Sequence, residues 1–375
     1  MYFDLTDEQQ AIKSTAHDFL ASRLKSERLR EIAASESGFD EAGWQEMAEL
    51  GWAGLALPEE WGGQGLGIVD LAVLFEEMGY VCAPSPLLSS TIAGLALAFA
   101  GSDEQKERWL APLAAGELRG APALVDAGAP AEPNTFAMMA EGNGEGLVLD
   151  GEKTLVMDAA SADFFLVATA DGRRHIVEKG SEGVTVVPEE SIDLTRRLSS
   201  VRLEGVRVAP ENTLPGDAED YWPVFQRACV AIAAESTGVA QRALDMSVAY
   251  AKDRQQFGRP IGAYQAVSHR CAQMLLETEN SRSAVYGAAW AADAEPESLP
   301  LAASMAKAYA SDAGWRVPDA AIQTHGGIGF TWEHDLHFFL KRGRANAATF
   351  GDAKWHRERV ADAVLAAGVA EPASA

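Results

Sequence analysis

Apolar residues recur at helical spacing near the N-terminus of the chain and again throughout its second half. The first such segment begins at Thr6 and Gln9, which match a capping box, and we expect a helix from there to about Leu24. Further helices are expected over residues 39–50, 68–78, 87–100 and 103–113. Residues 1–118 are therefore predicted to form an α-helical domain.

The pattern changes between about residues 121 and 209, where short β-branched runs are separated by Gly and Asp. Such runs are typical of strands joined by tight turns. We expect strands over residues 146–151, 164–168, 174–178, 183–187 and 203–208. Residues 119–215 are therefore predicted to form a β-sheet domain that resembles a barrel.

Helical periodicity returns at Tyr221 and continues towards the end of the chain. Two long helices are expected over residues 223–253 and 266–292, because Gly258 and Pro260 interrupt the pattern between them. Many alanines and glycines in this region allow helix backbones to approach closely. We assign residues 216–375 to a four-helix bundle, and the whole chain to the α+β multidomain class.

Composition excludes several classes of function. The 375 residues carry a net charge of −24, which disfavours nucleic acid and anionic membranes as partners. The three cysteines are scattered, so neither a disulfide framework nor a metal site is expected. The chain begins without the pattern of a signal peptide and contains no uncharged run long enough to span a membrane. A cytoplasmic protein is expected.

Candidate binding residues lie at the join between the two long helices. Arg254, Phe257 and Gln265 place a cation, an aromatic ring and an amide close together in the sequence. Such a group suits a ligand with a phosphate end and an aromatic end, because guanidinium binds phosphate and rings stack. The alternative is that Arg254 caps the preceding helix while Phe257 belongs to the core.

Three motifs resemble the acyl-CoA dehydrogenase family and occur in the family's order. The first is Leu57-Pro-Glu-Glu-Trp61-Gly62-Gly63-Gln-Gly65-Leu-Gly67, the second is Arg254-x-x-Phe257-Gly258-Arg259-Pro260-Ile261 with Gln265, and the third is Gln323-Thr-His-Gly326-Gly327-Ile-Gly329-Phe330. The similarity extends over nearly the whole chain. It implies a helical domain, a β domain and a C-terminal bundle, in agreement with the periodicity.

The resemblance also implies a reaction and its cofactor. Members of this family remove two hydrogens from an acyl-CoA thioester, with FAD taking the hydride and, by resemblance, an electron-transfer flavoprotein as the acceptor. In the family the second and third motifs hold the pyrophosphate and adenosine of a neighbouring subunit's FAD. The residues that inherit this role are Arg254, Phe257, Gln265, Gln323, Gly326, Gly327 and Gly329.

The segments that hold the flavin ring in relatives differ in this chain. Val125 and Ala131 replace a threonine and a serine, while Leu155 and Met157 replace an aromatic residue and a threonine. None of these four side chains can donate a hydrogen bond to the ring. We therefore expect a heteromer, such as an α2β2 tetramer, in which the flavin ring lies on a homologous partner chain. Heteromers of this family act on bulky esters, notably steroid side-chain CoA esters.

The catalytic base is the part of the resemblance that this chain matches least well. Phe350 stands where the commonest family base is a glutamate, with Asp352 two residues later, and Ala228 stands at the alternative base position. Glu235 follows Ala228 on the same helical face in an apolar setting, which would raise its pKa and suit a base. The alternative is that Glu235 pairs with a cation such as Arg227 or Arg242.

Three other functions are compatible with these motifs. The chain could be a self-sufficient homotetrameric dehydrogenase with a modified flavin site. It could instead be a catalytically silent subunit that stabilises a partner. A third alternative is a flavin monooxygenase or nitroalkane oxidase on the same fold, since the usual glutamate is missing.

Overall fold

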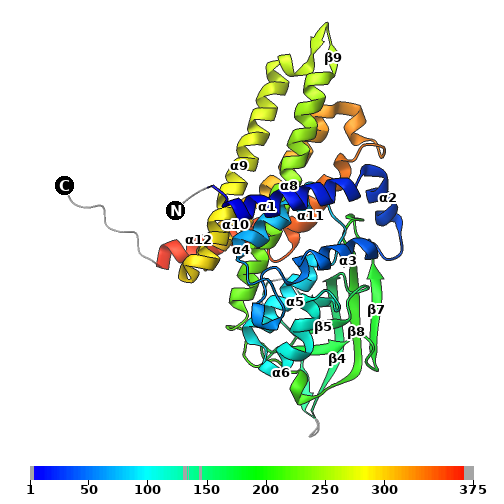
Figure 1. Ribbon diagram of the computed structural model, residues 1–375, viewed down its shortest axis with the longest axis vertical. Coiled ribbons are helices and arrows are strands. Elements are labelled where there is room, and N and C mark those ends of the chain that lie inside the picture. The colour runs from blue at the N-terminus through cyan, green and yellow to red at the C-terminus, as the bar shows by residue number, and fades with distance from the viewer. Residues whose placement is uncertain (1–3, 130–132, 134, 143–145, 367–375) are drawn as a thin grey trace, which may run out of the picture.

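A computed structural model describes residues 4–129, 133, 135–142 and 146–366. The β domain lies at one end of the molecule and the two longest helices extend away from it at the other (Figure 1). The N-terminal helices lie against both parts. The expected order of helical, β and helical segments is confirmed.

The N-terminal segment is helical, as its periodicity predicts. Its helices are α1 (Asp7–Arg23), α2 (Ser26–Ala34), α3 (Glu41–Glu49), α4 (Ile68–Tyr80), α5 (Leu87–Ala100), α6 (Asp103–Gln105) and α7 (Ala111–Ala114), with a π-helical turn over Lys106–Leu110. The capping box at the start of α1 forms, because Thr6 Oγ1 accepts from Gln9 N at 3.2 Å and Gln9 Oε1 accepts from Thr6 N at 3.1 Å. The short helix α2 was not expected from the pattern.

The β domain contains two sheets with a shared apolar interior. One sheet has the order β1 (Gly120–Ala123), β5 (Phe164–Ala168), β6 (Arg174–Glu178), with β1 parallel to β5. The other has the order β2 (Val125–Asp126), β4 (Leu147–Met157), β8 (Leu198–Val208), β7 (Val184–Glu189), and β3 (Ala140–Gly142) also pairs with β4. The register of β4 against β8 is irregular between Lys153 and Val156, where Leu155 has a φ of 54°.

The C-terminal segment is a bundle of long helices. These are α8 (Trp222–Asp253), α9 (Gln265–Ala294), α10 (Leu299–His325), α11 (Leu336–Ala348) and α12 (Ala353–Ala366). A small hairpin of β9 (Gln255–Gln256) and β10 (Arg259–Pro260) joins α8 to α9. It projects from the end of the bundle opposite the β domain (Figure 1).

Glycines allow the close helix crossings that the composition predicts. A Cβ at Gly238 of α8 would lie 1.8 Å from the carbonyl oxygen of Glu76 in α4. A Cβ at Gly343 of α11 would lie 1.9 Å from the carbonyl oxygen of Gly314 in α10. No side chain fits at either distance, so backbone packs directly on backbone at both crossings.

The main apolar core is continuous across the two helical segments. It joins α4 and α5 to α8, α9 and α10, and includes Phe164 and Leu166 of the β domain. A second, separate core lies between the two sheets of the β domain. The limits 1–118, 119–215 and 216–375 remain sequence predictions, because the main core runs across the first and last of these ranges. Among the described residues, no helix combines the length and apolar character that crossing a bilayer requires. The same residues contain no group of three His, Cys, Asp or Glu side chains placed to hold a metal ion.

Candidate active-site cavity and cofactor surface

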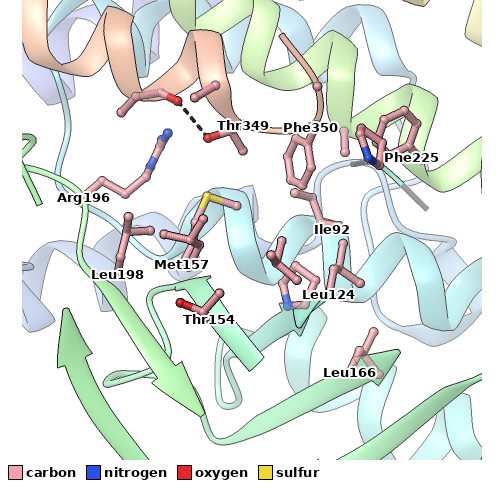
Figure 2. A pocket seen from close by; sticks show the side chains of 18 of the residues that line it. Ile92, Leu124, Thr154, Met157, Leu166, Arg196, Leu198, Phe225, Thr349 and Phe350 are labelled. Carbon is pink, nitrogen blue, oxygen red and sulfur yellow. Dashed lines mark hydrogen bonds between the residues drawn. The ribbon is translucent and has the colours of Figure 1, made fainter. Parts of the chain in front are cut away.

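A cavity of about 410 Å³ lies where the β domain meets α5, α8 and the turn after α11. Figure 2 shows that Ile92, Met157 and Phe350 face this space from three different parts of the chain. Most of the wall is apolar. Its other apolar members include Ala96, Leu124, Val125, Leu166, Leu198, Val224, Phe225 and Ala228.

The β-domain wall of the cavity lacks hydrogen-bond donors at the positions where relatives hold the flavin ring. Val125 and Met157 both line the cavity, and neither side chain can donate. Glu189 engages the donors nearby, since its Oε1 accepts from Thr154 Oγ1 at 2.5 Å and from Leu155 N at 3.3 Å. A flavin ring needs donors along its polar edge, so the residues present do not fit a ring bound here. Ala131, the other departure in this region, lies outside the described residues.

Phe350 is fixed in the cavity wall by the turn that carries it. Its φ is 59°, which a bulky residue adopts only where the surroundings impose it. His356 Nε2 bonds to the Phe350 carbonyl at 2.9 Å, and the fully buried Lys307 donates to the Gly351 carbonyl at 2.9 Å. Asp352 points elsewhere, because its Oδ1 accepts from Trp355 N at 2.8 Å at the start of α12. These contacts fix the backbone of the turn that places Phe350, the residue predicted at the position of the family glutamate, in the cavity wall.

Glu235 lies in a buried network of charges rather than in an apolar pocket. Its two oxygens accept from Arg196 Nη2 at 2.8 and 2.7 Å, and its Oε1 accepts from Arg342 Nη1 at 2.6 Å. Asn346 Nδ2 donates to Oε2 at 3.0 Å. Arg342, which is fully buried, also donates to Asp193 Oδ2 at 2.6 Å. The network therefore ties the segment before β8 to α8 and α11.

The expectation of a raised pKa at Glu235 is wrong. Burial by itself would raise the pKa, but the guanidiniums of Arg196 and Arg342 outweigh it and hold the pKa below its ordinary value. Glu235 does not line the cavity. These contacts favour the structural alternative, although with cations other than those expected. Arg227 donates to the Pro223 and Ala292 carbonyls, and Arg242 to the Tyr80 hydroxyl.

The remaining carboxylates at the cavity are poor candidates for a base. Asp193 lines it but is held by Arg342 and by Thr195, whose N–H and hydroxyl both donate to Oδ1. Glu190 lines it from an exposed position. A base must be partly desolvated and away from a cation to reach a useful pKa. Glu190 is exposed and Asp193 is paired with Arg342, so neither group meets both conditions.

Asp158 follows β4 beside this network and has an unusual titration. Burial raises its pKa to about 6, and the charge of Glu235 acts in the same direction. Arg196, Arg342 and the hydrogen bond from Ser89 Oγ at 2.8 Å lower the pKa but do not outweigh burial. The ordinary value is 3.8. The folded chain therefore binds more protons than the unfolded chain between these values, so stability falls as pH rises through this window.

Asp158→Asn is expected to stabilise the protein in a pH-dependent way. Asn accepts the Ser89 hydrogen bond and tolerates the φ of 56° at this position, but carries no charge. We expect a gain of about 1–2 kcal/mol in unfolding free energy near neutral pH and almost none at about pH 4. Thermal unfolding of both proteins across this range measures the difference. An equal gain at every pH would contradict the titration.

The second candidate region is a surface at the far end of the bundle, here called the bundle-end surface. It consists of residues that the sequence predicted to bind a dinucleotide, and these are exposed: Arg254, Phe257, Gln265, Gln323, Gly326 and Gly327. Phe257 is 93% exposed with a φ of 53°, so the alternative that it belongs to the core is wrong. A bulky apolar residue in this state on a hairpin tip is typical of a binding surface.

The structure brings the two predicted motifs to the same end of the bundle. The ring of Tyr250 stacks on that of His325 with centroids 4.4 Å apart. Tyr250 lies one turn before Arg254, whose N–H donates to the Tyr250 carbonyl at 2.8 Å, and His325 directly precedes Gly326. The arginine motif at the end of α8 and the glycine motif at the end of α10 are therefore held together by one aromatic contact.

The glycine motif fits close approach of a ligand. Gly326 has a φ of 64° and a ψ of −141°, a conformation that glycine alone adopts readily. A Cβ at Gly326 or Gly327 would meet nothing within 4 Å, so their backbone faces open space. Gly329 is buried, and a Cβ there would lie 2.8 Å from Cβ of His325. The residues present fit a pyrophosphate lying over the motif, with Arg254 as the cation.

Comparison with known proteins identifies relatives over most of the chain. The acyl-CoA dehydrogenase N-terminal domain family matches residues 6–117, and the C-terminal domain family matches residues 224–365. The acyl-CoA dehydrogenase IpdE2 of Mycolicibacterium smegmatis is 32% identical over 92% of this chain and 96% of its own length. The probable acyl-CoA dehydrogenase YngJ of Bacillus subtilis is 32% identical over 91% and 93%.

Solved structures with the same fold include heteromeric complexes. A chain of the ChsE4–ChsE5 complex from Mycobacterium tuberculosis superposes with a TM-score of 0.89 at 27% identity, covering all of both chains. A chain of the Tcur3481–Tcur3483 steroid ACAD superposes with a TM-score of 0.87 at 32% identity, covering 96% of this chain and 98% of that one.

Proposed function

Because the chain belongs to the acyl-CoA dehydrogenase family, we propose that it is one subunit of a heteromeric acyl-CoA dehydrogenase. In this assembly its bundle-end surface binds the pyrophosphate and adenosine of an FAD whose ring lies on a homologous partner chain. When bound, the FAD would supply the hydride acceptor for an acyl-CoA, and the partner would supply the base. This chain therefore contributes FAD-binding residues to an active site that lies on the partner chain.

One observation carries this proposal. The cavity that corresponds to the active site has Phe350 and Met157 where relatives place a base and a hydroxyl, and Glu189 takes the nearby donors. The bundle-end surface, by contrast, retains Arg254 and the glycines in an open arrangement. The residues predicted to bind the dinucleotide are thus kept, while those predicted to hold the flavin ring and act as the base are lost. This difference supports an active site shared between two chains.

Relatives support the substrate class and the acceptor that we propose. We propose an acyl-CoA thioester as the substrate, and a bulky acyl group such as a steroid side chain, since the similar Tcur3481–Tcur3483 protein is described as a steroid ACAD. A complex of a similar reductase with an electron-transfer flavoprotein supports that class of acceptor. Cys82, Cys229 and Cys271 are all free, which supports a cytoplasmic location.

Arg254→Ala tests the proposal in the co-purified complex. Loss of a charged hydrogen bond to phosphate is expected to weaken FAD binding by about 10-fold to 100-fold without dissociating the subunits. FAD retained during dilution and gel filtration measures the effect. Lys252→Ala is the matched control, because Lys252 is an exposed cation in the last turn of the same helix. Equal FAD retention in the two variants would show that Arg254 holds no phosphate.

A further inference from the structure

The turn over residues 331–335, here called the post-glycine turn, directly follows the glycine motif and is held by helix α2. Arg30 of α2 donates from Nη1 to the Trp332 carbonyl at 2.7 Å and from Nη2 to the Glu333 carbonyl at 3.1 Å. The same Nη2 donates to Asp335 Oδ1 at 2.5 Å. One arginine of the N-terminal segment therefore binds two backbone carbonyls and a carboxylate of the post-glycine turn.

A guanidinium suits this set of acceptors, because its planar fork presents several N–H donors in fixed directions. The guanidinium carbon of Arg30 also lies 5.3 Å from the ring centre of Phe338 in α11. Beneath it, Leu29 and Ala33 of α2 share a small apolar core with Phe338 and Phe339. Helix α2 is therefore docked on α11, and this docking fixes Arg30 in position over the turn.

The post-glycine turn carries His334, which contacts the motifs of the bundle-end surface. The rings of His334 and His325 have centroids 4.7 Å apart, and His325 stacks on Tyr250 in the contact that joins the arginine and glycine motifs. The Leu336 N–H donates to His334 Nδ1 at 3.3 Å, which orients the His334 ring. Because His325 directly precedes the first glycine of the motif, a shift of the turn would displace the glycine motif as well.

The backbone of the post-glycine turn is otherwise bonded locally. The Thr331 N–H donates to the Ile328 carbonyl at 3.1 Å, and the His334 N–H donates to the Thr331 carbonyl at 3.3 Å. Trp332 is 57% exposed, so the turn gains little from burial. Exposed segments with local hydrogen bonds open readily, and the bonds from Arg30 oppose this opening.

We propose that Arg30 is a positioning residue for the dinucleotide, which keeps the glycine motif in its ligand-binding conformation by holding the post-glycine turn. The inference rests on the proposed function, because the bundle-end surface is where the pyrophosphate and adenosine of FAD would bind. It gives α2, a helix of the N-terminal segment, a part in cofactor binding through residues at the other end of the chain.

Titration of the flavin-free complex with FAD and with FMN tests this role. FMN lacks the adenosine and one phosphate of FAD, so it depends less on the bundle-end surface. Arg30→Ala is expected to weaken FAD binding about 10-fold and FMN binding less than about 2-fold, because the freed turn no longer holds the glycine motif. Arg30→Lys keeps the charge without the fork and should recover only part of the FAD affinity. Arg28→Ala is the matched control, because Arg28 lies on the same helix but pairs with Glu31 and Asp40.

Hydrogen exchange of the same variants shows whether the turn depends on Arg30. In Arg30→Ala the amides of Thr331, His334 and Leu336 should exchange about 10-fold faster than in the parent, while those of α8 keep their rates. Equal exchange in Arg30→Ala and Arg28→Ala would overturn the inference, since the turn would then be held by other contacts.

The outcomes separate this inference from the proposed function. If exchange rises in Arg30→Ala but FAD binding does not change, while Arg254→Ala loses FAD, the positioning role is wrong and the shared FAD site stands. If FAD and FMN binding fall together with the unfolding midpoint, Arg30 serves stability alone and the inference is wrong. If neither Arg254→Ala nor Arg30→Ala affects FAD binding, both proposals are wrong.

Discussion

Glu235→Ala is expected to destabilise the protein by about 3–5 kcal/mol, because it removes the shared acceptor of two buried guanidiniums. Arg196 and Arg342 would lose contacts of 2.6–2.8 Å, and Arg342 would keep Asp193 as its remaining carboxylate. Both cations are too deeply buried for water to replace the carboxylate readily. A large fall in the midpoint of thermal or urea unfolding is the measurement.

A matched control separates this effect from the loss of any ion pair. Glu358→Ala removes a carboxylate that pairs with Lys354 on exposed α12, at 3.7 Å. Exposed pairs contribute little, so this variant should change stability by less than about 1 kcal/mol.

A second variant, Glu235→Gln, decides between the catalytic and the structural interpretation of Glu235. A catalytic base predicts that Glu235→Gln loses turnover of the complex while its unfolding midpoint is unchanged. A structural ion pair predicts a lower unfolding midpoint for Glu235→Gln. Turnover would then be lost only under conditions in which the complex unfolds. A Glu235→Gln complex that is fully stable and inactive would overturn the structural interpretation.

Much of the fold could be predicted because its signals are local. The capping box at Thr6 depends on residues three positions apart, and the boundaries of α5 and α8 follow from periodicity with Pro and Gly at the breaks. Helix α2 was missed because Ser26–Ala34 is short and its apolar residues, Leu29, Ile32 and Ala33, give only one turn of pattern.

The site was harder to predict because its decisive contacts are distant in the sequence. Glu235 meets Arg196 and Arg342 across 39 and 107 residues, and no local pattern indicates which cation a carboxylate will meet. The apolar residues near Glu235 indicated burial correctly but gave the wrong sign for the pKa shift. The contacts of Arg174 with the rings of Phe136 and Tyr221 also had no signal, since these residues come together only in the folded chain.

The departures from the flavin-ring motif were visible in the sequence, and they remove hydrogen-bond donors from the cavity wall. Val125 and Met157 line the cavity, and neither side chain supplies the hydroxyl that relatives have at its position. Glu189 takes the Thr154 hydroxyl that could otherwise have served. The prediction that the ring lies on another chain depends on the loss of donors at these particular positions.

Flavin content gives the most direct test of the shared site. The chain should be purified alone and after co-expression with homologous acyl-CoA dehydrogenase chains of the same organism, and its FAD measured by visible absorbance against protein mass. We predict a colourless protein alone, and a yellow complex with half a flavin per chain in the presence of the partner. One FAD on every copy of the chain purified alone would contradict the account, because Val125, Met157 and Phe350 would then surround a complete flavin site.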